Sequence, residues 1–316
     1  MLTAIAQRVG RAILLMWFVT VITFLTLRLT PGDPAELLLG PAAADPDSAA
    51  LVQELRHTLG LDRSVVVQYG TWIGRLLRGD LGTSNQSGTA ILPTVLAAAS
   101  PTVWLIVLSL VVAVPISVLL GLGAARARSR WVDATVRHLS SLAMATPGFW
   151  IGLLFIIFFA VKLGALPSTG YTSPQVSFGG FLEHMILPVA TLSIYLIGIL
   201  VRFVHLEATT ALQSDFTRTA RAMGISRGRT TWVYTLRNAV LPMITVVGVQ
   251  MGSLIGGAVL VEQVFGLGGL GQLMLQGVLN RDYPTVQGAV LFTTAAVVLA
   301  TTLADVIRSV VDPRIR

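Results

Sequence analysis

Residues 101–125 read PTVWLIVLSLVVAVPISVLLGLGAA, an apolar run that contains no ionisable side chain. As a helix this run would extend about 37 Å, which exceeds the hydrocarbon thickness of a bilayer. Apolar runs of about 10–14 residues are typical of buried helices in soluble proteins, and this one is much longer. Five further runs have a similar character: 12–29, 139–163, 186–204, 239–261 and 285–307. The sequence therefore predicts an all-α integral membrane protein with six transmembrane helices.

The composition supports this prediction. Hydrophobic residues make up 54% of the 316 residues, charged residues make up 12%, and the mean hydropathy is +0.77. Soluble globular domains carry about 25% charged residues. In a soluble protein the net charge of +7 and the pI of 10.7 would suggest nucleic acid as a partner. In a membrane protein the distribution of charge between the two sides matters more, and we predict no nucleic-acid partner.

Positive charge is concentrated on one side of the predicted spans. Of the 22 Lys and Arg residues, 15 lie on the side that holds both termini, whereas 10 of the 15 Asp and Glu residues lie on the other side. The positive-inside rule therefore predicts cytoplasmic termini. Arg8 and Arg11 before the first run would also suit a cleaved signal peptide. The run is long, however, and no small-residue cleavage site precedes residues 30–34, so we expect it to remain as a membrane anchor.

The predicted organisation has three parts. Residues 1–29 form the cytoplasmic N-terminus and the first span, residues 30–99 form an extracytoplasmic insert, and residues 100–316 form a core of five helices that includes a cytoplasmic loop at 205–237. In the insert we expect one helix after an Asp45 cap, with Pro46 at its first position, and another from Ser64 to Arg78. Such a small helical insert is typical of a lid or a docking platform.

Several classes of active site have no support in the sequence. The chain has no cysteine, and its only lysine, Lys162, is not part of a P-loop. The four histidines form no H-E-x-x-H motif, and no G-x-S-x-G elbow is present. We therefore predict no catalytic residues, no metal site and no cofactor bound by this chain. The centres of the spans hold no ionisable residue, which disfavours a secondary carrier.

The cytoplasmic loop contains a short amphipathic segment, Ser214 to Gly224, with the sequence SDFTRTARAMG. Ser214 or Asp215 is a suitable N-cap, and Gly224 is a suitable helix stop. The spacing places Phe216, Ala220 and Met223 on one face of the helix, and Arg218 and Arg221 on another. A helix of two turns is marginal in isolation, so it needs a binding surface. The spacing alone allows either a lipid surface or a partner protein.

The same loop carries a family resemblance. Arg218-Thr219-Ala220-Arg221-Ala222-x-Gly224 and the later stretch LRNAVLP at 236–242 resemble the cytoplasmic loop of binding-protein-dependent ABC importer permeases. More narrowly, the chain resembles the dipeptide/oligopeptide/nickel permease family and its B-type dipeptide subunits. Motifs along nearly the whole chain agree in order and spacing: PGDP at 31–34, GDLG at 79–82, HMILP at 184–188, FGLGGLG at 265–271, RDYP at 281–284 and DPR at 312–314. Two features differ from the general permease motif. Arg-Thr-Ala stands in place of Glu-Ala-Ala, and the distance from Gly224 to Leu241-Pro242 is longer; both features narrow the subfamily.

The resemblance implies a type I ABC importer fold, a function and a set of partners. It implies that a coupling helix docks in a groove of a cytoplasmic ATPase, and that this helix consists of Phe216, Thr217, Arg218, Thr219, Ala220, Arg221, Ala222, Met223 and Gly224. One or two ATPase subunits would use ATP and Mg²⁺, and a homologous second permease would complete the pore. A substrate-binding protein would dock from outside, on the 30–99 insert among other surfaces. The expected location is the bacterial inner membrane.

The fifth span contains candidates for helix packing and for a translocation path. Gly248, Gly252 and Gly256 form a stripe of small residues, which can pack within the chain or against the second permease. Pro115 and Pro242 would permit kinks in spans 2 and 5. We predict that Gln250, Ser253 and Glu262 face the translocation path, and that Phe265–Gly271 forms a tight extracellular turn.

The function predicted from the residues and the resemblance together is translocation of short peptides, driven by ATP hydrolysis in separate subunits. A nickel or nickel-chelate importer, a glutathione importer and an opine importer remain alternatives in the same family. A stand-alone secondary carrier or channel is the alternative in class, and a membrane-tethered structural or sensor protein is a third. Genes for a second permease, a binding protein and ATPases beside this one would exclude the carrier.

Overall fold

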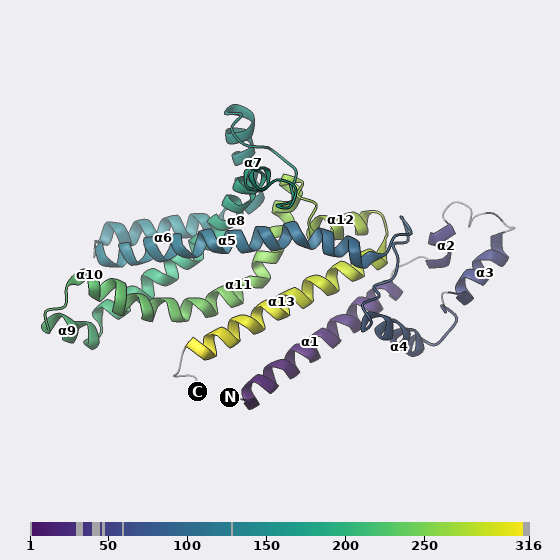
Figure 1. The fold of residues 1–316 in the computed structure, drawn as a ribbon, viewed down its shortest axis with the longest axis horizontal. Helices are drawn as coiled ribbons and strands as arrows, with labels where there is room; N and C mark the ends of the chain where they lie inside the picture. Colours follow the sequence, from purple (N-terminus) through teal and green to yellow (C-terminus); the bar gives the residue numbers. More distant parts are fainter. Residues whose placement is uncertain are drawn as a thin grey trace. The chain divides into compact units, whose positions relative to one another are not determined.

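The computed structural model describes residues 2–29, 34–39, 45, 48–58, 60–127 and 129–311. In this part of the chain the regular structure is helical, apart from one isolated antiparallel bridge between Thr83 and Ala90 (Figure 1). The helices are α1 Leu2–Leu29, α2 Pro34–Leu39, α3 Ala49–Thr58, α4 Val65–Leu76, α5 Ile91–Ala127, α6 Arg130–Ala145, α7 Gly148–Phe155, the π-helix η3 Ile156–Lys162, α8 Phe178–Gln213, α9 Asp215–Ala222, α10 Arg227–Arg229, the π-helix η4 Thr230–Thr235, α11 Leu236–Phe265, α12 Leu270–Leu279 and α13 Tyr283–Val311. The motifs at 31–33 and 312–314, and the expected Pro46 helix start, lie outside the described residues.

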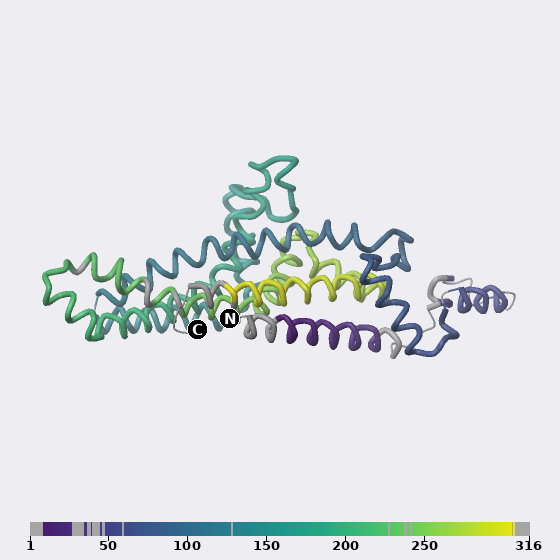
Figure 2. Tube along the Cα trace, turned by 60° about the horizontal axis from the view of Figure 1, so that its bottom comes forward, coloured from purple at the N-terminus to yellow at the C-terminus, as the bar shows by residue number. Residues whose placement is uncertain are grey.

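Within the described residues, five helices are individually long and apolar enough to cross a membrane: α1, α5, α8, α11 and α13. The third predicted span, 139–163, is not one straight helix. It falls on the end of α6 and on α7 and η3, and the α6 and α7–η3 segments are bent by 92° from one another (Figures 1 and 2). Thr146, which precedes Pro147, has extended backbone angles because a proline disfavours the helical conformation of the residue before it. Counting the bent pair as one span gives the predicted six.

The chain divides into two compact units. The larger is made mainly of Ser100–Gln272, and its core is built around α8, which packs against α6, α7 and α11. Leu196, Leu200 and Val204 of α8 are fully buried in this core. Because α8 has protein on several sides, it is the most deeply buried of the long apolar helices.

The smaller unit contains Ala6–Ala99 and Leu273–Ala296. Here α4 packs against α1: the ring of Phe24 lies 5.4 Å from that of Tyr69 and 5.7 Å from that of Trp72, measured between centroids. The hydroxyl groups of Thr20 and Tyr69 are 2.8 Å apart and share a hydrogen bond. Tyr69 and Trp72 of α4 therefore cover part of the first span. The rest of α1 is largely exposed, as expected for a helix that faces lipid or another subunit.

Candidate functional site

The short helix α9 follows directly after the long helix α8, near the end of the larger unit that also carries α10 (Figure 1). The predicted loop at 205–237 is mostly helical, because α8 continues to Gln213 and is followed by α9, α10 and η4. Ser214 occupies the N-cap position, but its hydroxyl donates to the carbonyl of Ala211 at 2.6 Å instead of capping α9. The Thr217 hydroxyl donates to the same carbonyl at 2.6 Å. These two bonds fix α9 to the end of α8.

The buried face of α9 differs from the predicted apolar face. Thr217 and Ala220 are buried, whereas 41% of Phe216 and 69% of Met223 remain exposed. Thr217 is buried because its hydroxyl has the Ala211 carbonyl as a partner. Of the three residues of the predicted apolar face, Ala220 is the one that is buried. The two large apolar side chains are thus free to contact another surface.

The two arginines of α9 have different surroundings. Arg218 is exposed, and its Nη1 lies 3.5 Å from Oδ1 of Asp215, an exposed ion pair that adds little stability. Arg221 is half-buried, and its Nε is buried without a hydrogen-bond partner in the described structure. A buried N–H of this kind is costly unless water pairs with it.

The end of α9 is a Schellman motif. The amide of Ile225 donates to the carbonyl of Ala220 at 3.1 Å, and the amide of Gly224 donates to that of Arg221 at 3.0 Å. Gly224 has a φ of +78°, a left-handed conformation that costs little only for glycine. The predicted helix stop at Gly224 is confirmed. The helix α9 also packs against η4. Within η4, the Thr235 hydroxyl donates to the carbonyl of Thr230 at 3.2 Å.

The glycine stripe of α11 is divided between buried and exposed positions. At Gly248 an added Cβ would lie 3.0 Å from the Cβ of Ala304 on α13, so this glycine allows close packing within the chain. Gly252 and Gly256 are exposed, and no atom lies within 4 Å of an added Cβ at either position. Gly248 therefore serves packing within the chain, whereas Gly252 and Gly256 remain open to packing against another subunit.

The three predicted path residues are not equivalent. Ser253 is exposed and Gln250 is half-buried on α11. Glu262 is fully buried: its carboxylate accepts hydrogen bonds from the Thr102 hydroxyl at 2.5 Å and from the backbone amides of Gly271 at 2.8 Å and Gln272 at 3.4 Å. In this chain Glu262 joins α11 to α5 and to the start of α12. Its place on a path stays a prediction.

The Glu262 contacts explain the glycine-rich sequence after α11. Gly266 ends α11 in a left-handed conformation, which confirms the predicted tight turn. A Cβ at Gly269 would overlap the Glu262 carboxylate, and one at Gly271 would lie 2.7 Å from the Cα of Val259. The turn closes onto the carboxylate only because these two positions lack side chains.

Other buried polar groups of the larger unit were not predicted. Ser109 and Ser117 on α5, and Thr245 and Gln263 on α11, carry buried side-chain atoms without a hydrogen-bond partner in the described structure. Such groups are costly unless water or another protein pairs with them. The sequence feature that could have identified these residues is a polar side chain within an apolar run. These four positions are therefore additional candidates for a path or a subunit interface.

In the smaller unit, Asp282 of the RDYP motif accepts three hydrogen bonds. The Asp282 carboxylate accepts from the hydroxyls of Ser84 and Thr285, both at 2.6 Å, and from the Asn85 amide at 3.0 Å. Asp282 thereby joins the Thr285 hydroxyl in the first turn of α13 to the loop that follows GDLG. Ser84 and Asp282, which are 198 residues apart along the chain, are thus joined by a buried hydrogen bond.

Comparison with known proteins agrees with this geometry. Residues 117–316 match the family described as binding-protein-dependent transport system inner membrane component, and residues 1–115 match the N-terminal family of the same membrane component. A putative peptide transport system permease protein of Brucella melitensis is 38% identical, over 100% of this chain and 99% of its own length.

Two other relatives have comparable similarity. A probable peptide ABC transporter permease protein of Sinorhizobium fredii is 35% identical, over 99% of this chain and 98% of its own. The glutathione transport system permease protein GsiC of Salmonella choleraesuis is 36% identical, over 100% of this chain and 99% of its own. The similarity therefore extends over all the features described above.

Proposed function

Because this chain belongs to the family of binding-protein-dependent transport system inner membrane components, we propose that it carries short peptides across the membrane. It is a multi-pass permease subunit of an ABC importer, a class that works with ATPase subunits and a substrate-binding protein. The observation that carries the peptide assignment is the full-length similarity to two relatives named as peptide permeases. Glutathione, in the name of a third relative, is itself a small peptide.

The coupling surface of this importer is α9. We propose that Phe216 and Met223, both exposed, insert into a groove of a cytoplasmic ATPase. The bonds from Thr217 and Ser214 to Ala211 would transmit a displacement of α9 to α8. Because α8 is the centre of the larger unit, its movement would shift the helices that pack on it.

The chemistry of the cycle belongs to other subunits. We propose that one or two ATPases use ATP and Mg²⁺, while this chain binds no cofactor or metal and performs no covalent step. ATP binding and release would bias the bundle between inward-open and outward-open states. In this proposal α9 transmits the conformational changes of the ATPases to the helices that move the cargo.

A second, homologous permease would complete the pore. The exposed Gly252 and Gly256 support this proposal, because small residues allow two membrane helices to approach closely. Gln250 and Ser253 lie on the same helix and would face the path between the two permeases.

The proposed orientation follows from the charges. Cytoplasmic termini in a bacterial inner membrane would place α9 on the side of the ATPases and the insert at 30–99 on the side of the binding protein. The insert would then provide part of the docking surface for that protein, and α4 would hold it against α1.

The test of the cargo is the ligand of the binding protein. Purified under native conditions, this protein should release di- or oligopeptides that mass spectrometry identifies, and reconstituted importer should take up the same peptides with ATP. Tight binding of a nickel complex or an opine, without binding of peptides, would overturn the peptide assignment and leave the permease class intact.

A further inference from the structure

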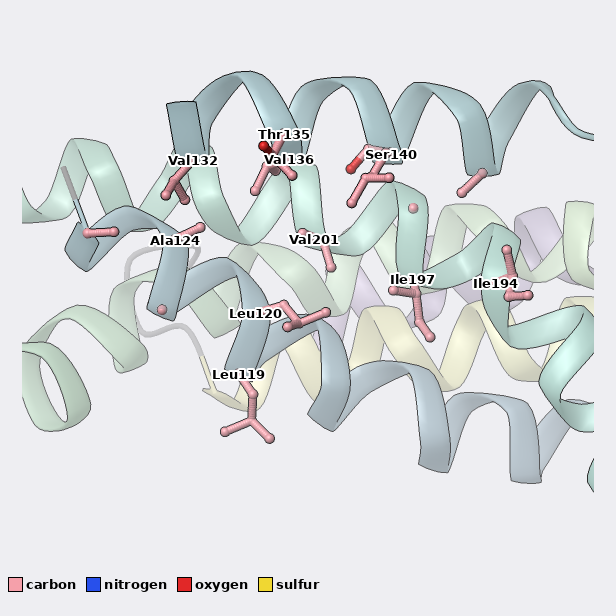
Figure 3. A pocket seen from close by; sticks show the side chains of 15 residues that line it. Leu119, Leu120, Ala124, Val132, Thr135, Val136, Ser140, Ile194, Ile197 and Val201 are labelled. Carbon is pink, nitrogen blue, oxygen red and sulfur yellow. The ribbon is translucent and has the colours of Figure 1, made fainter. Parts of the chain in front are cut away.

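A cavity of about 610 Å³ lies between α5, α6 and α8, within the larger unit (Figure 3). Its lining is almost wholly apolar and includes Leu120, Ala124, Val136, Ile197 and Val201. Among the described residues, no charged side chain lines it. A space with this lining suits a hydrocarbon chain and offers little to a polar ligand.

The cavity exists because α8 holds its two neighbours closely while α5 lacks large side chains at one end. Gly198 allows α6 to approach α8, since an added Cβ would lie 2.9 Å from the Cβ of Ala143. Gly121 does the same for α5, where an added Cβ would lie 2.7 Å from Val204. Gly123, Ala124 and Ala127 then leave the space beside them unfilled.

The cavity opens to the outside of this chain. Leu119, Leu120 and Leu139, which line it, are 55%, 54% and 60% exposed. Because α5 and α8 are membrane-spanning helices, this opening faces the hydrocarbon of the bilayer or another subunit.

One end of the cavity is marked by positive charge. Arg126 stands next to the lining residue Ala127, and Arg130 stands two positions before the lining residue Val132; both arginines are exposed. The nearby acid, Asp133, is already engaged by His205, whose Nε2 lies 3.0 Å from its Oδ1.

Trp131, which lies between Arg130 and the lining residue Val132 in the sequence, is 84% exposed. Tryptophan and arginine together are typical of the level of the lipid headgroups. We therefore expect the charged end at headgroup depth and the apolar lining among the acyl chains.

We propose that this cavity binds an anionic phospholipid, with one acyl chain between α5, α6 and α8 and the phosphate held by Arg126 and Arg130. A lipid of this kind matches both halves of the site, whereas a zwitterionic lipid matches only the apolar half. By the positive-inside distribution, the lipid belongs to the cytoplasmic leaflet. The site does not depend on which cargo the importer carries.

The test uses the assembled importer in phosphatidylcholine nanodiscs that contain a trace of phosphatidylglycerol or phosphatidylcholine with a photoactivatable acyl chain. Peptide mass spectrometry then locates the labelled residues. We expect phosphatidylglycerol to label 119–143 and 194–201 in preference to phosphatidylcholine by roughly thirtyfold, from two arginines at the membrane surface. The double substitution Arg126→Gln with Arg130→Gln should remove this preference.

Matched variants distinguish loss of lipid binding in the cavity from general effects of adding a leucine or removing two arginines. Gly123→Leu fills the cavity, because nothing lies within 4 Å of an added Cβ there, and should reduce labelling by both lipids. Gly10→Leu adds the same side chain to α1, and Arg75→Gln with Arg78→Gln removes the same charge from the insert. These controls should leave labelling of the cavity unchanged.

Three results would overturn the proposal. One is equal labelling of the cavity by the two lipids, and another is labelling that Gly123→Leu leaves unchanged. The third is a cross-link from Leu120→Cys to the second permease, which would show that a protein helix fills the cavity. The absence of native cysteine makes this last measurement specific.

Discussion

The exposed pair on α9 gives the sharpest prediction. Phe216→Glu with Met223→Glu would replace two apolar side chains by carboxylates at the proposed ATPase contact. Full burial of a Phe or Met side chain contributes about 1.5–3 kcal/mol. Scaling this range by the exposed fractions, 41% and 69%, gives about 2.5 kcal/mol for the pair and hence about sixtyfold weaker docking. Burial of the new charges would weaken it further.

The assay is peptide-stimulated ATP hydrolysis by the reconstituted importer, together with co-purification of the ATPase. We expect both to fall in the double variant, while membrane insertion stays normal because neither side chain is part of the buried core. Val66→Glu is the matched control, since Val66 is 80% exposed on α4, which belongs to the smaller unit. Unchanged stimulation in the double variant would refute the coupling role of this pair.

Three further substitutions test the turns that the structure depends on. Gly224→Pro should abolish uptake while the protein remains in the membrane fraction, because proline cannot adopt a φ of +78° or donate to the Arg221 carbonyl; normal uptake would refute the need for this cap. Gly269→Ala should lower the midpoint of thermal unfolding in detergent, because the new methyl group displaces the Glu262 carboxylate at a cost of about 1–3 kcal/mol; an unchanged midpoint would argue against the Glu262 contacts. Asp282→Ala should expose the chain near Ser84 to limited proteolysis, since each stranded buried donor costs about 1–3 kcal/mol; an unchanged cleavage pattern would contradict this role of Asp282.

The long helices were predictable because apolar runs such as 101–125 dominate their sequences. The break in the third predicted span was missed, although Pro147 is visible in the sequence. A hydropathy window averages over many residues, so a single proline changes it little. The same proline forces the residue before it, Thr146, into an extended backbone conformation. Similarly, the window for the fourth span ended near Val204, but α8 continues to Gln213 because a helix can extend beyond the membrane.

The position of the candidate coupling helix was predictable from local signals, because Ser214 and Gly224 mark its ends. Its buried face was not predictable. Periodicity groups Phe216 with Ala220 and Met223, whereas burial follows the bond between Thr217 and the Ala211 carbonyl.

The partners of Glu262 show a second limit of the sequence. Thr102 lies 160 residues away along the chain, so no local pattern could connect the two side chains. Polar contacts of this kind depend on tertiary structure, and the sequence indicates only that a carboxylate at the end of an apolar run needs a partner.

The central claim is that α9 is the contact through which a cytoplasmic ATPase drives this permease. Since the chain has no native cysteine, Met223→Cys places a single thiol on the exposed face of α9. A heterobifunctional thiol–amine cross-linker applied to the assembled importer should join this thiol to the ATPase, and the same reagent should give no such product with Val66→Cys. If Met223→Cys gives no ATPase product although the ATPase co-purifies, α9 is not the contact.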